Sequence, residues 1–412
     1  MTSKFRPGWI RGVGSLALLS ALAGSIGCAE AAVRARGVGL WVPAEGENAT
    51  LDDRKKIRAL VEKARAAGVT DLYAQVYRGG RAWYPTRLAD DSPSRRAGAD
   101  PLAHLIELAS ATGGGGRALR VHAWINAFSL ARNREAPILR ELGPEAVLRD
   151  LHGRSLLDYP GDGRPPWASG FALGTPGIYL DPAHLQVRRR LVDIASELAR
   201  RYAGLAGVHL DYIRYPYALP IAPGSHFSPR LDFGYGRLST ERFRAETGRT
   251  APARGVQRSP ADYQAWDDWR RLQVTETVKE VEQDLRARRP GLLFSAAVLP
   301  WADRAYLAAF QDWRGWLRAG LLDEAVLMNY TRDEKLAAYI SQGTLAWRPS
   351  PGAAGGRRGK VLIGLGAYLF NGDPEPIHRQ WRAALRAGAD GVVLFSYDAI
   401  RKHEGFWRFP FP

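Results

Sequence analysis

Short apolar runs alternate with longer amphipathic stretches along most of the chain. We expect eight of the runs to be buried β-strands, because they are short, rich in Val, Leu and aromatic residues, and bounded by Gly, Pro or polar residues. They cover about residues 37–43, 69–77, 118–126, 208–212, 292–299, 323–329, 360–367 and 391–396. Each is followed by a helix or a helix-bearing connection. Strand–helix alternation predicts a parallel sheet, and eight such units predict a single closed (β/α)8 TIM barrel.

Amphipathic spacing predicts the intervening helices. They cover about residues 51–67, 101–111, 183–202, 239–247, 261–288, 303–319, a stretch after 333, and 374–387. Thr50 followed by Asp53 resembles a capping box with Asp in place of Glu. Residues 127–183 and 217–237 are expected to be long loops, after strands three and four, of the kind that are usually functional or inserted. A nucleotide-binding sheet is not expected, because no Gly-rich phosphate motif follows the first strand.

The N-terminus predicts export. Basic residues precede an apolar run, Val13 to Ile26, that is too short to span a bilayer but suits a secretory signal. Two cleavage sites compete: Ala29-Glu30-Ala31 suits ordinary signal peptidase, and Cys28 resembles a lipoprotein site. We favour lipidation of Cys28, because the only cysteine of the chain would rarely fall there by chance. The predicted parts are a signal peptide over residues 1–28 and a barrel over 34–410.

The charge balance narrows the partners. The chain has 58 Lys and Arg against 42 Asp and Glu, a formal net charge of +16. No Lys/Arg block typical of nucleic-acid binding accompanies this excess, so nucleic acid is not a predicted partner. A cationic exterior favours an anionic envelope surface or polymer. We expect membrane contact only through a lipid anchor on Cys28, in an outer-membrane, periplasmic or cell-surface lipoprotein, or else a secreted protein.

Polar and aromatic residues stand at the carboxyl ends of the predicted strands, where a barrel has its active site. They are Trp41, Glu45, Gln75, Tyr77, Arg78, His122, Trp124, Asn126, Asp211, Tyr212, Arg214, Trp301, Asp303, Asn329, Tyr330, Asp333, Tyr368, Tyr397 and Asp398. The set has no metal-ligand spacing, so no metal or other cofactor is predicted. A thiol nucleophile is excluded because Cys28 is in the leader, and no G-x-S-x-G elbow supports a serine hydrolase.

Carboxylates with aromatic faces and amides are typical of a carbohydrate site, since two acids suffice for glycoside hydrolysis. We expect Asp211 to be catalytic, with Asp398 or Asp303 as the partner acid and Glu45 and Asp333 as weaker candidates. Predicted substrate-binding residues are Trp41, Gln75, Arg78, Trp124, Asn126, Tyr212, Arg214, Asn329, Tyr330 and Tyr397. His122 is expected to be a core histidine. The Trp266 and Trp269 pair has helical spacing and is expected to pack.

Several of these segments together resemble the bacterial glycosyl-hydrolase-like family 10. They are Gly37-Val38-Gly39-Leu40-Trp41-Val42, Gln75-Val76-Tyr77-Arg78-Gly79, His122-Ala123-Trp124-Ile125-Asn126, Leu180-Asp181-Pro182, His209-Leu210-Asp211-Tyr212-Ile213-Arg214-Tyr215-Pro216, Met328-Asn329-Tyr330 and Phe395-Ser396-Tyr397. The resemblance implies a (β/α)8 barrel, export to the envelope and hydrolysis of peptidoglycan strands or amino-sugar exopolysaccharide. The family's fourth-strand acid maps onto Asp211. Many members carry a second Asp beside it, where this chain has Tyr212.

The sequence alone leaves the role of Asp211 open. It is either the nucleophile or the group that stabilises the oxocarbenium-like transition state, and the acetamido group of an N-acetylated sugar could attack instead. The competing function is that of a non-catalytic glycan-binding envelope lipoprotein on a degenerate barrel. A barrel esterase or deacetylase has less support, because a metal triad and a Ser elbow are both absent.

Overall fold

The computed structural model describes residues 37–98, 100–112, 117–168, 170–221, 231–253, 259–347 and 359–410. The predicted signal peptide and Cys28 lie outside these residues. Within them, no helix combines the length and the apolar character needed to cross a membrane.

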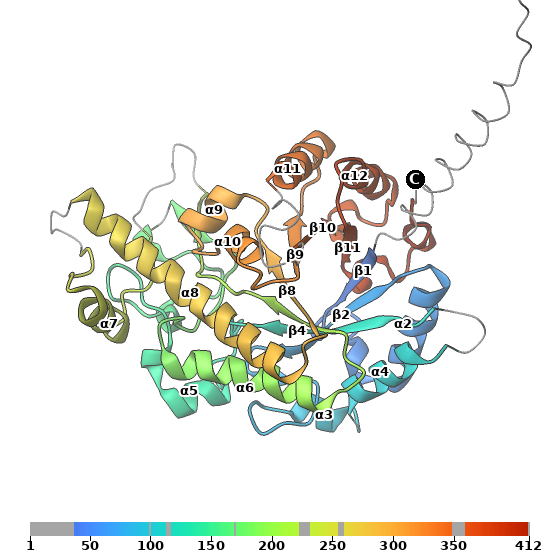
Figure 1. Cartoon of the computed structure of the whole chain (residues 1–412), viewed down its shortest axis with the longest axis horizontal. Helices are drawn as coiled ribbons and strands as arrows, with labels where there is room; N and C mark the ends of the chain where they lie inside the picture. The colour runs from blue at the N-terminus through green and yellow to red at the C-terminus, as the bar shows by residue number, and fades with distance from the viewer. Residues whose placement is uncertain are drawn as a thin grey trace, which may run out of the picture. The chain divides into compact units, whose positions relative to one another are not determined.

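Eight parallel strands form the predicted closed barrel (Figure 1). In order around the barrel they are β1 (Gly37–Val42), β2 (Asp71–Arg78), β4 (Arg120–Asn126), β6 (Gly207–Asp211), β8 (Leu293–Val298), β9 (Glu324–Asn329), β10 (Lys360–Gly366) and β11 (Gly391–Phe395). The first strand pairs with both β2 and β11, which closes the sheet. The strands read as nearly continuous apolar runs because helices cover their outer face and side chains fill their inner face.

Helices surround the barrel. The longer ones are α2 (Arg54–Ala66), α4 (Pro101–Ser110), α6 (Leu185–Arg201), α7 (Arg237–Thr247), α8 (Pro260–Arg288), α11 (Glu334–Ala346) and α12 (Glu375–Arg386). The shorter ones are α3 (Ser92–Arg96), α5 (Pro137–Leu142), α9 (Ala302–Leu307), α10 (Trp313–Arg318) and α13 (Tyr397–Ile400). On the outside of the barrel, α6 packs beside α8, and α11 packs beside α12 (Figure 1).

Two helix predictions need correction. Instead of one helix over 303–319, the chain forms α9 and α10, because Phe310 between them adopts a left-handed backbone conformation (φ +52°). The expected capping box at Thr50 is also absent, because Thr50 opens a short 3-10 turn. Asp53 is the N-cap of α2, where its Oδ1 accepts the Lys55 and Lys56 N–H groups at 2.6 and 3.2 Å.

The two long connections are not structureless. Residues 127–183 contain α5, several 3-10 turns and β5 (Phe171–Leu173). This short strand pairs antiparallel with β7 (Ala218–Pro220) from the following connection. The pairing joins the loops that follow the third and fourth barrel strands, so that both reach the same side of the barrel mouth.

The interior of the barrel is aromatic and histidine-rich. Tyr73 stacks on His122 with ring centroids 4.6 Å apart, and His122 Nε2 lies 2.7 Å from Asp71 Oδ1. Trp41 Nε1 donates to His209 Nε2 at 3.2 Å, so we assign the proton of His209 to Nδ1, which faces Ser295 Oγ at 2.9 Å. His122 is fully buried, and the prediction of a core histidine is confirmed.

The tryptophan pair on α8 also packs as expected. The Trp266 and Trp269 rings stack at 5.3 Å, and both contact Phe243 of α7. This cluster lies in a separate hydrophobic core that joins α7 to α8.

Candidate functional site

A cavity of about 660 Å³ opens at the carboxyl ends of the strands. Nine of the predicted site residues line it: Trp41, Gln75, Arg78, Trp124, Asp211, Tyr212, Arg214, Tyr330 and Asp398. Glu45, Trp301 and Tyr368, read from the same strand ends, line it as well. The barrel therefore brings together most of the residues that sequence patterning selected.

Asp211 ends β6 and points inward. Side chains alternate along a strand, so Val208 and Leu210 pack into the outer core while His209 and Asp211 face the barrel interior. Asp211 is only 6% exposed. Its Oδ1 accepts the Tyr212 backbone N–H at 2.7 Å and an Arg214 Nη1 N–H at 3.3 Å.

Competing effects set the protonation of Asp211. Burial raises the pKa of the Asp211 carboxyl above its usual value, while the charge of Arg214 and the Tyr212 N–H oppose that rise. The Trp124 indole N–H makes no hydrogen bond in the structure, but it lies near enough to Asp211 to oppose the rise of its pKa as well. The site thus holds a buried carboxylate with a built-in counter-charge.

Tyr212 and Arg214 form one unit around this carboxylate. Tyr212 has a left-handed backbone conformation (φ +52°), which is costly for a residue other than glycine. This turn directs the Tyr212 N–H back to Asp211, and it places the Tyr212 ring under the Arg214 guanidinium, 4.5 Å from the ring centroid. Strained backbone at a strand end is typical of functional sites.

Asp398 is a second carboxylate that lines the cavity with Asp211. It lies in the first turn of α13, directly after β11. Asn48 N–H donates to its Oδ2 at 3.3 Å, whereas its buried Oδ1 has no hydrogen-bond partner among the described residues. Burial raises the pKa of Asp398, with the backbone N–H of Asn48 and the charge of Arg401 opposing. Gly46 is required beside it, because a Cβ there would collide with the carboxylate.

Glu45 lines the same cavity but is held differently. Its Oε2 lies 3.0 Å from Arg78 Nε, and its Oε1 accepts from Arg81 Nη1 at 3.0 Å. Both carboxylate oxygens are therefore occupied by guanidinium groups. This arrangement distinguishes Glu45 from Asp398, whose Oδ1 has no hydrogen-bond partner among the described residues.

Aromatic rings form the floor and wall. Phe395 lies 5.9 Å from Trp41, 6.3 Å from Trp124 and 5.5 Å from Tyr330, measured between ring centroids. Tyr368, which is 50% exposed, extends this cluster toward solvent, 6.0 Å from Tyr330. Such apolar faces suit the apolar faces of sugar rings.

Four predicted residues lie outside this lining. Asn126 is buried behind Gln75, whose Nε2 donates to Asn126 Oδ1 at 3.1 Å. Asn329 faces the helices and donates to Ala337 O at 2.9 Å, and Tyr397 packs edge-on against Trp407.

The fourth, Asp303, is exposed on α9 and lines a different pocket. Asp303 therefore does not share the cavity with Asp211, whereas Asp398 does.

Sequence patterning missed residues that come from the loops. Gly174, Thr175 and Tyr217 line the cavity, and the β5–β7 pairing places them there. Gly174 packs so closely on the Tyr217 ring that a Cβ at this position would collide with it. The Gly-Thr-Pro turn at 174–176 and the tyrosine after Pro216 were visible, but the pairing of two distant loops left no local pattern.

No cluster of three or more His, Cys, Asp or Glu side chains suitable for a metal ion occurs in the described part of the chain. The cavity itself offers three carboxylates, of which Glu45 is paired with guanidinium groups, together with guanidinium and indole donors and aromatic faces.

Comparisons with known proteins agree with this picture. Residues 35–382 match the family described as glycosyl hydrolase-like 10. The chain is 23% identical to the glycosyl hydrolase DigH of Escherichia coli K12, over 88% of this chain and 81% of that protein. It is 22% identical to the glycosyl hydrolase YngK of Bacillus subtilis, over 66% of this chain and 48% of that protein. The family resemblance seen in the sequence is confirmed.

The fold has solved counterparts. The catalytic domain of β-amylase from Paenibacillus polymyxa superimposes with a TM-score of 0.57 at 10% identity, covering 91% of this chain and 97% of that domain. At this identity the likeness shows the shared barrel alone. Support for a glycosidase comes from the family match.

Proposed function

Because this chain belongs to the glycosyl hydrolase-like 10 family, we propose that it hydrolyses O-glycosidic bonds of a polysaccharide in the cavity at the barrel mouth. One observation carries the proposal: Asp211, at the end of β6, and Asp398, in α13 after β11 on the opposite side of the barrel, line the same cavity together with aromatic side chains. Two carboxylates flanking an aromatic-lined cleft are the equipment of glycoside hydrolysis.

In this mechanism Asp398 is the general acid. Burial raises the pKa of both carboxyls, so the assignment rests on their partners. Asp398 Oδ1 has no hydrogen-bond partner among the described residues, which favours a proton there for the leaving glycosidic oxygen, whereas Asp211 accepts from Arg214 and the Tyr212 N–H. Asp211 is ionised and stabilises the positive charge that develops at the anomeric carbon, with Arg214 and the Tyr212 N–H maintaining the carboxylate. Water supplies the hydroxyl of the new reducing end, and the proton that it gives up restores Asp398.

The proposed substrate is a cell-envelope or extracellular polysaccharide, either the glycan strands of peptidoglycan or an amino-sugar exopolysaccharide. Its support is the N-terminal sequence, which predicts export and lipidation of Cys28, together with the formal charge of +16. A protein held at the envelope would meet such polymers directly.

The test is an assay of the purified mature protein on denuded peptidoglycan and on poly-N-acetylglucosamine, with analysis of the products. Asp211→Asn and Asp398→Asn should each lower turnover about 10²- to 10⁴-fold without changing the thermal midpoint by more than a few degrees. Asp333→Asn is the matched control. Asp333 caps α11, where Asn also serves, and it does not line the cavity.

Full hydrolysis by Asp211→Asn would overturn the assignment. If wild type binds a glycan and releases no product from it, the glycan-binding alternative replaces the enzyme. Product stereochemistry, followed by NMR, would then decide between retention and inversion for an active wild type.

A further inference from the structure

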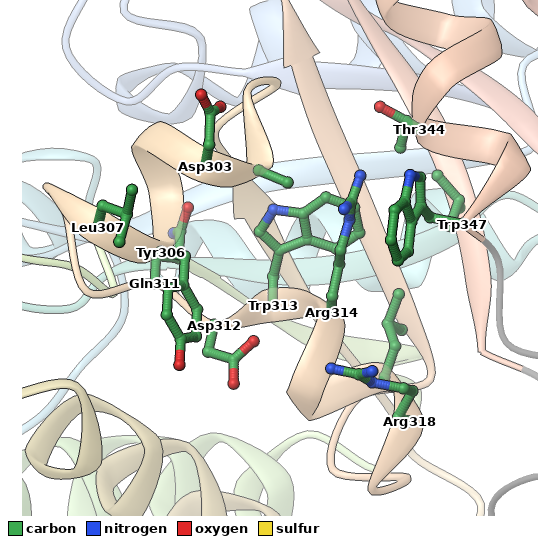
Figure 2. Close-up of a pocket in the computed structure, with 13 residues that line it drawn as sticks. Asp303, Tyr306, Leu307, Gln311, Asp312, Trp313, Arg314, Arg318, Thr344 and Trp347 are labelled. Atoms are coloured by element: carbon green, nitrogen blue, oxygen red, sulfur yellow. The ribbon is translucent and has the colours of Figure 1, made fainter. Parts of the chain in front are cut away.

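A second pocket of about 380 Å³ lies between α9, α10 and α11 on the outside of the barrel. Figure 2 shows the side chains that project into it from these three helices. The lining combines two tryptophans, a tyrosine, two arginines and two aspartates: Trp313, Trp347, Tyr306, Arg314, Arg318, Asp303 and Asp312. Aromatic, guanidinium and carboxylate side chains are typical of a carbohydrate site, and this pocket is separate from the cavity at the barrel mouth.

The centre of the pocket is a layered group. The Arg314 guanidinium lies between two indoles, 5.4 Å from the Trp313 ring and 4.8 Å from the Trp347 ring, as Figure 2 shows. Trp313 is only 2% exposed and forms the base, whereas Trp347 is 68% exposed and stands at the edge. Arg314 holds the ring of Trp347 in place at the surface, so an indole face is presented to solvent at little conformational cost.

Two polar groups in the pocket lack partners. Trp313 Nε1 and Arg314 Nε are buried and donate to no hydrogen-bond acceptor among the described residues. Asp303 attracts Arg314 only from beyond ion-pair distance. Asp312 is engaged elsewhere, because its Oδ1 caps α10 by accepting the Gly315 N–H at 2.9 Å. Unsatisfied buried N–H groups are costly, and a ligand with oxygen acceptors would satisfy them.

The pocket adjoins the cavity through α9. Trp301, the N-cap of α9, and Arg304 line the cavity, while Asp303 and Tyr306 of the same helix line the pocket. Gln311, which lines the pocket, is a second link between the two. Its Oε1 accepts the Leu299 N–H at 2.9 Å, and Leu299 lines the cavity. The cavity and the pocket therefore have α9 as a common wall.

We propose that this pocket is an accessory subsite that binds a second segment of the polysaccharide that is cleaved in the cavity. The proposal rests on the proposed function for the identity of its ligand. Sugar rings match the pocket because their apolar faces fit the exposed indole of Trp347, and their hydroxyl and acetamido oxygens can accept from Trp313 and Arg314. Simultaneous contact at both sites raises the effective concentration of the polymer at the cavity.

The test measures polymer binding by the full mature chain carrying Asp211→Asn, which keeps substrate intact. Sedimentation with denuded peptidoglycan, and retention on poly-N-acetylglucosamine, should weaken about tenfold when Trp347→Ala is added, the loss equivalent to about 1.4 kcal/mol. Tyr339→Ala is the matched control. Tyr339 belongs to the same helix, is 67% exposed and does not line the pocket. Trp313→Phe removes the buried N–H and keeps a ring, and it should weaken binding in the same direction.

The kinetic counterpart uses wild-type Asp211. Trp347→Ala should raise KM for the polymer while kcat is retained, and its KM for a short N-acetylglucosamine oligosaccharide should match that of Tyr339→Ala. Equal binding and equal polymer KM for Trp347→Ala and Tyr339→Ala would overturn the subsite and leave the hydrolase intact. Weakened binding by Trp347→Ala with no hydrolysis by wild type would support the subsite and refute the hydrolase. Binding that requires the peptide stems of peptidoglycan would assign the pocket to peptide and overturn the proposal.

Discussion

Replacing Arg214 by Met tests how the cavity controls the ionisation of Asp211. The side chains of Arg214 and Asp211 are 5% and 9% exposed, with Nη1 and Oδ1 3.3 Å apart. At an effective dielectric constant of about 20, unit charges at that distance attract by about 5 kcal/mol, which is an upper limit for the stabilisation of the Asp211 carboxylate by Arg214. Water entering the vacated space reduces the loss in the variant, but the pKa of Asp211 should still rise.

The direction of the effect on activity follows from that shift. Burial already raises the pKa of Asp211, and Arg214 is the main group that lowers it. Without Arg214, Asp211 stays protonated to higher pH, so the acid limb of the kcat/KM profile should move to higher pH. The activity of the variant relative to wild type should therefore increase with pH for as long as Asp398 remains protonated, which a purely structural role of Arg214 would not produce.

The assay is a pH–rate profile on whichever glycan wild type hydrolyses, with thermal unfolding measured in parallel. Arg271→Met is the control, because Arg271 is similarly buried and also pairs with an aspartate three residues earlier, Asp268 at 2.6 Å, outside the cavity. It should cost stability without moving the acid limb. An unchanged acid limb in Arg214→Met, with activity reduced equally at every pH, would refute the reasoning.

Two further predictions concern buried carboxylates away from the cavity. Burial raises the pKa of Asp181 to about 6. The folded state therefore holds its proton more tightly than the unfolded state, and stability should fall by about 3 kcal/mol as pH rises from 4 through 6, a dependence that Asp181→Asn should flatten in thermal unfolding. For Asp71, burial is outweighed by His122 and Arg120, which lower its pKa to about 2. Its contribution of about 2 to 3 kcal/mol should be present above pH 4 and lost as pH falls toward 2, so urea unfolding of Asp71→Asn should show that deficit at pH 7 but not near pH 2. A flat wild-type profile in the first case, or no deficit at pH 7 in the second, would contradict these assignments.

The barrel was predictable because its strands are buried on both faces. A run such as Gly391–Phe395 has no polar side chain on either face, and Gly391 opens it, so its type and its start were visible in the sequence. The break between α9 and α10 was not, since it depends on a left-handed Phe310 that neither Gly nor Pro marks. The β5–β7 pairing depends on contacts between two separate loops, which local spacing does not encode.

The candidate site was predictable as far as the sequence shows which side chains of each strand face the barrel interior. Asp211 faces inward because it is two residues after His209, whose ring lies in the barrel interior. Applied to β9, the same alternation puts Val326 and Met328 on the inner side and Asn329 outward, which agrees with its bond to Ala337. The sequence held that information, but assigning it required knowing which face of each strand is the inner one. The second pocket escaped prediction because it belongs to helix surfaces.

The pairing of β1 with β11 has a consequence for how the molecule forms. Gly37 lies opposite Gly391, so the ring of strands stays open until nearly the last element of the chain is available. Until then β1 and β10 each expose an unpaired backbone edge, which invites association with other chains. A chain emerging from its amino end, from a ribosome or through a membrane channel, cannot complete the cavity early. Shortened proteins that end before residue 391 are thus expected to aggregate rather than to retain partial function.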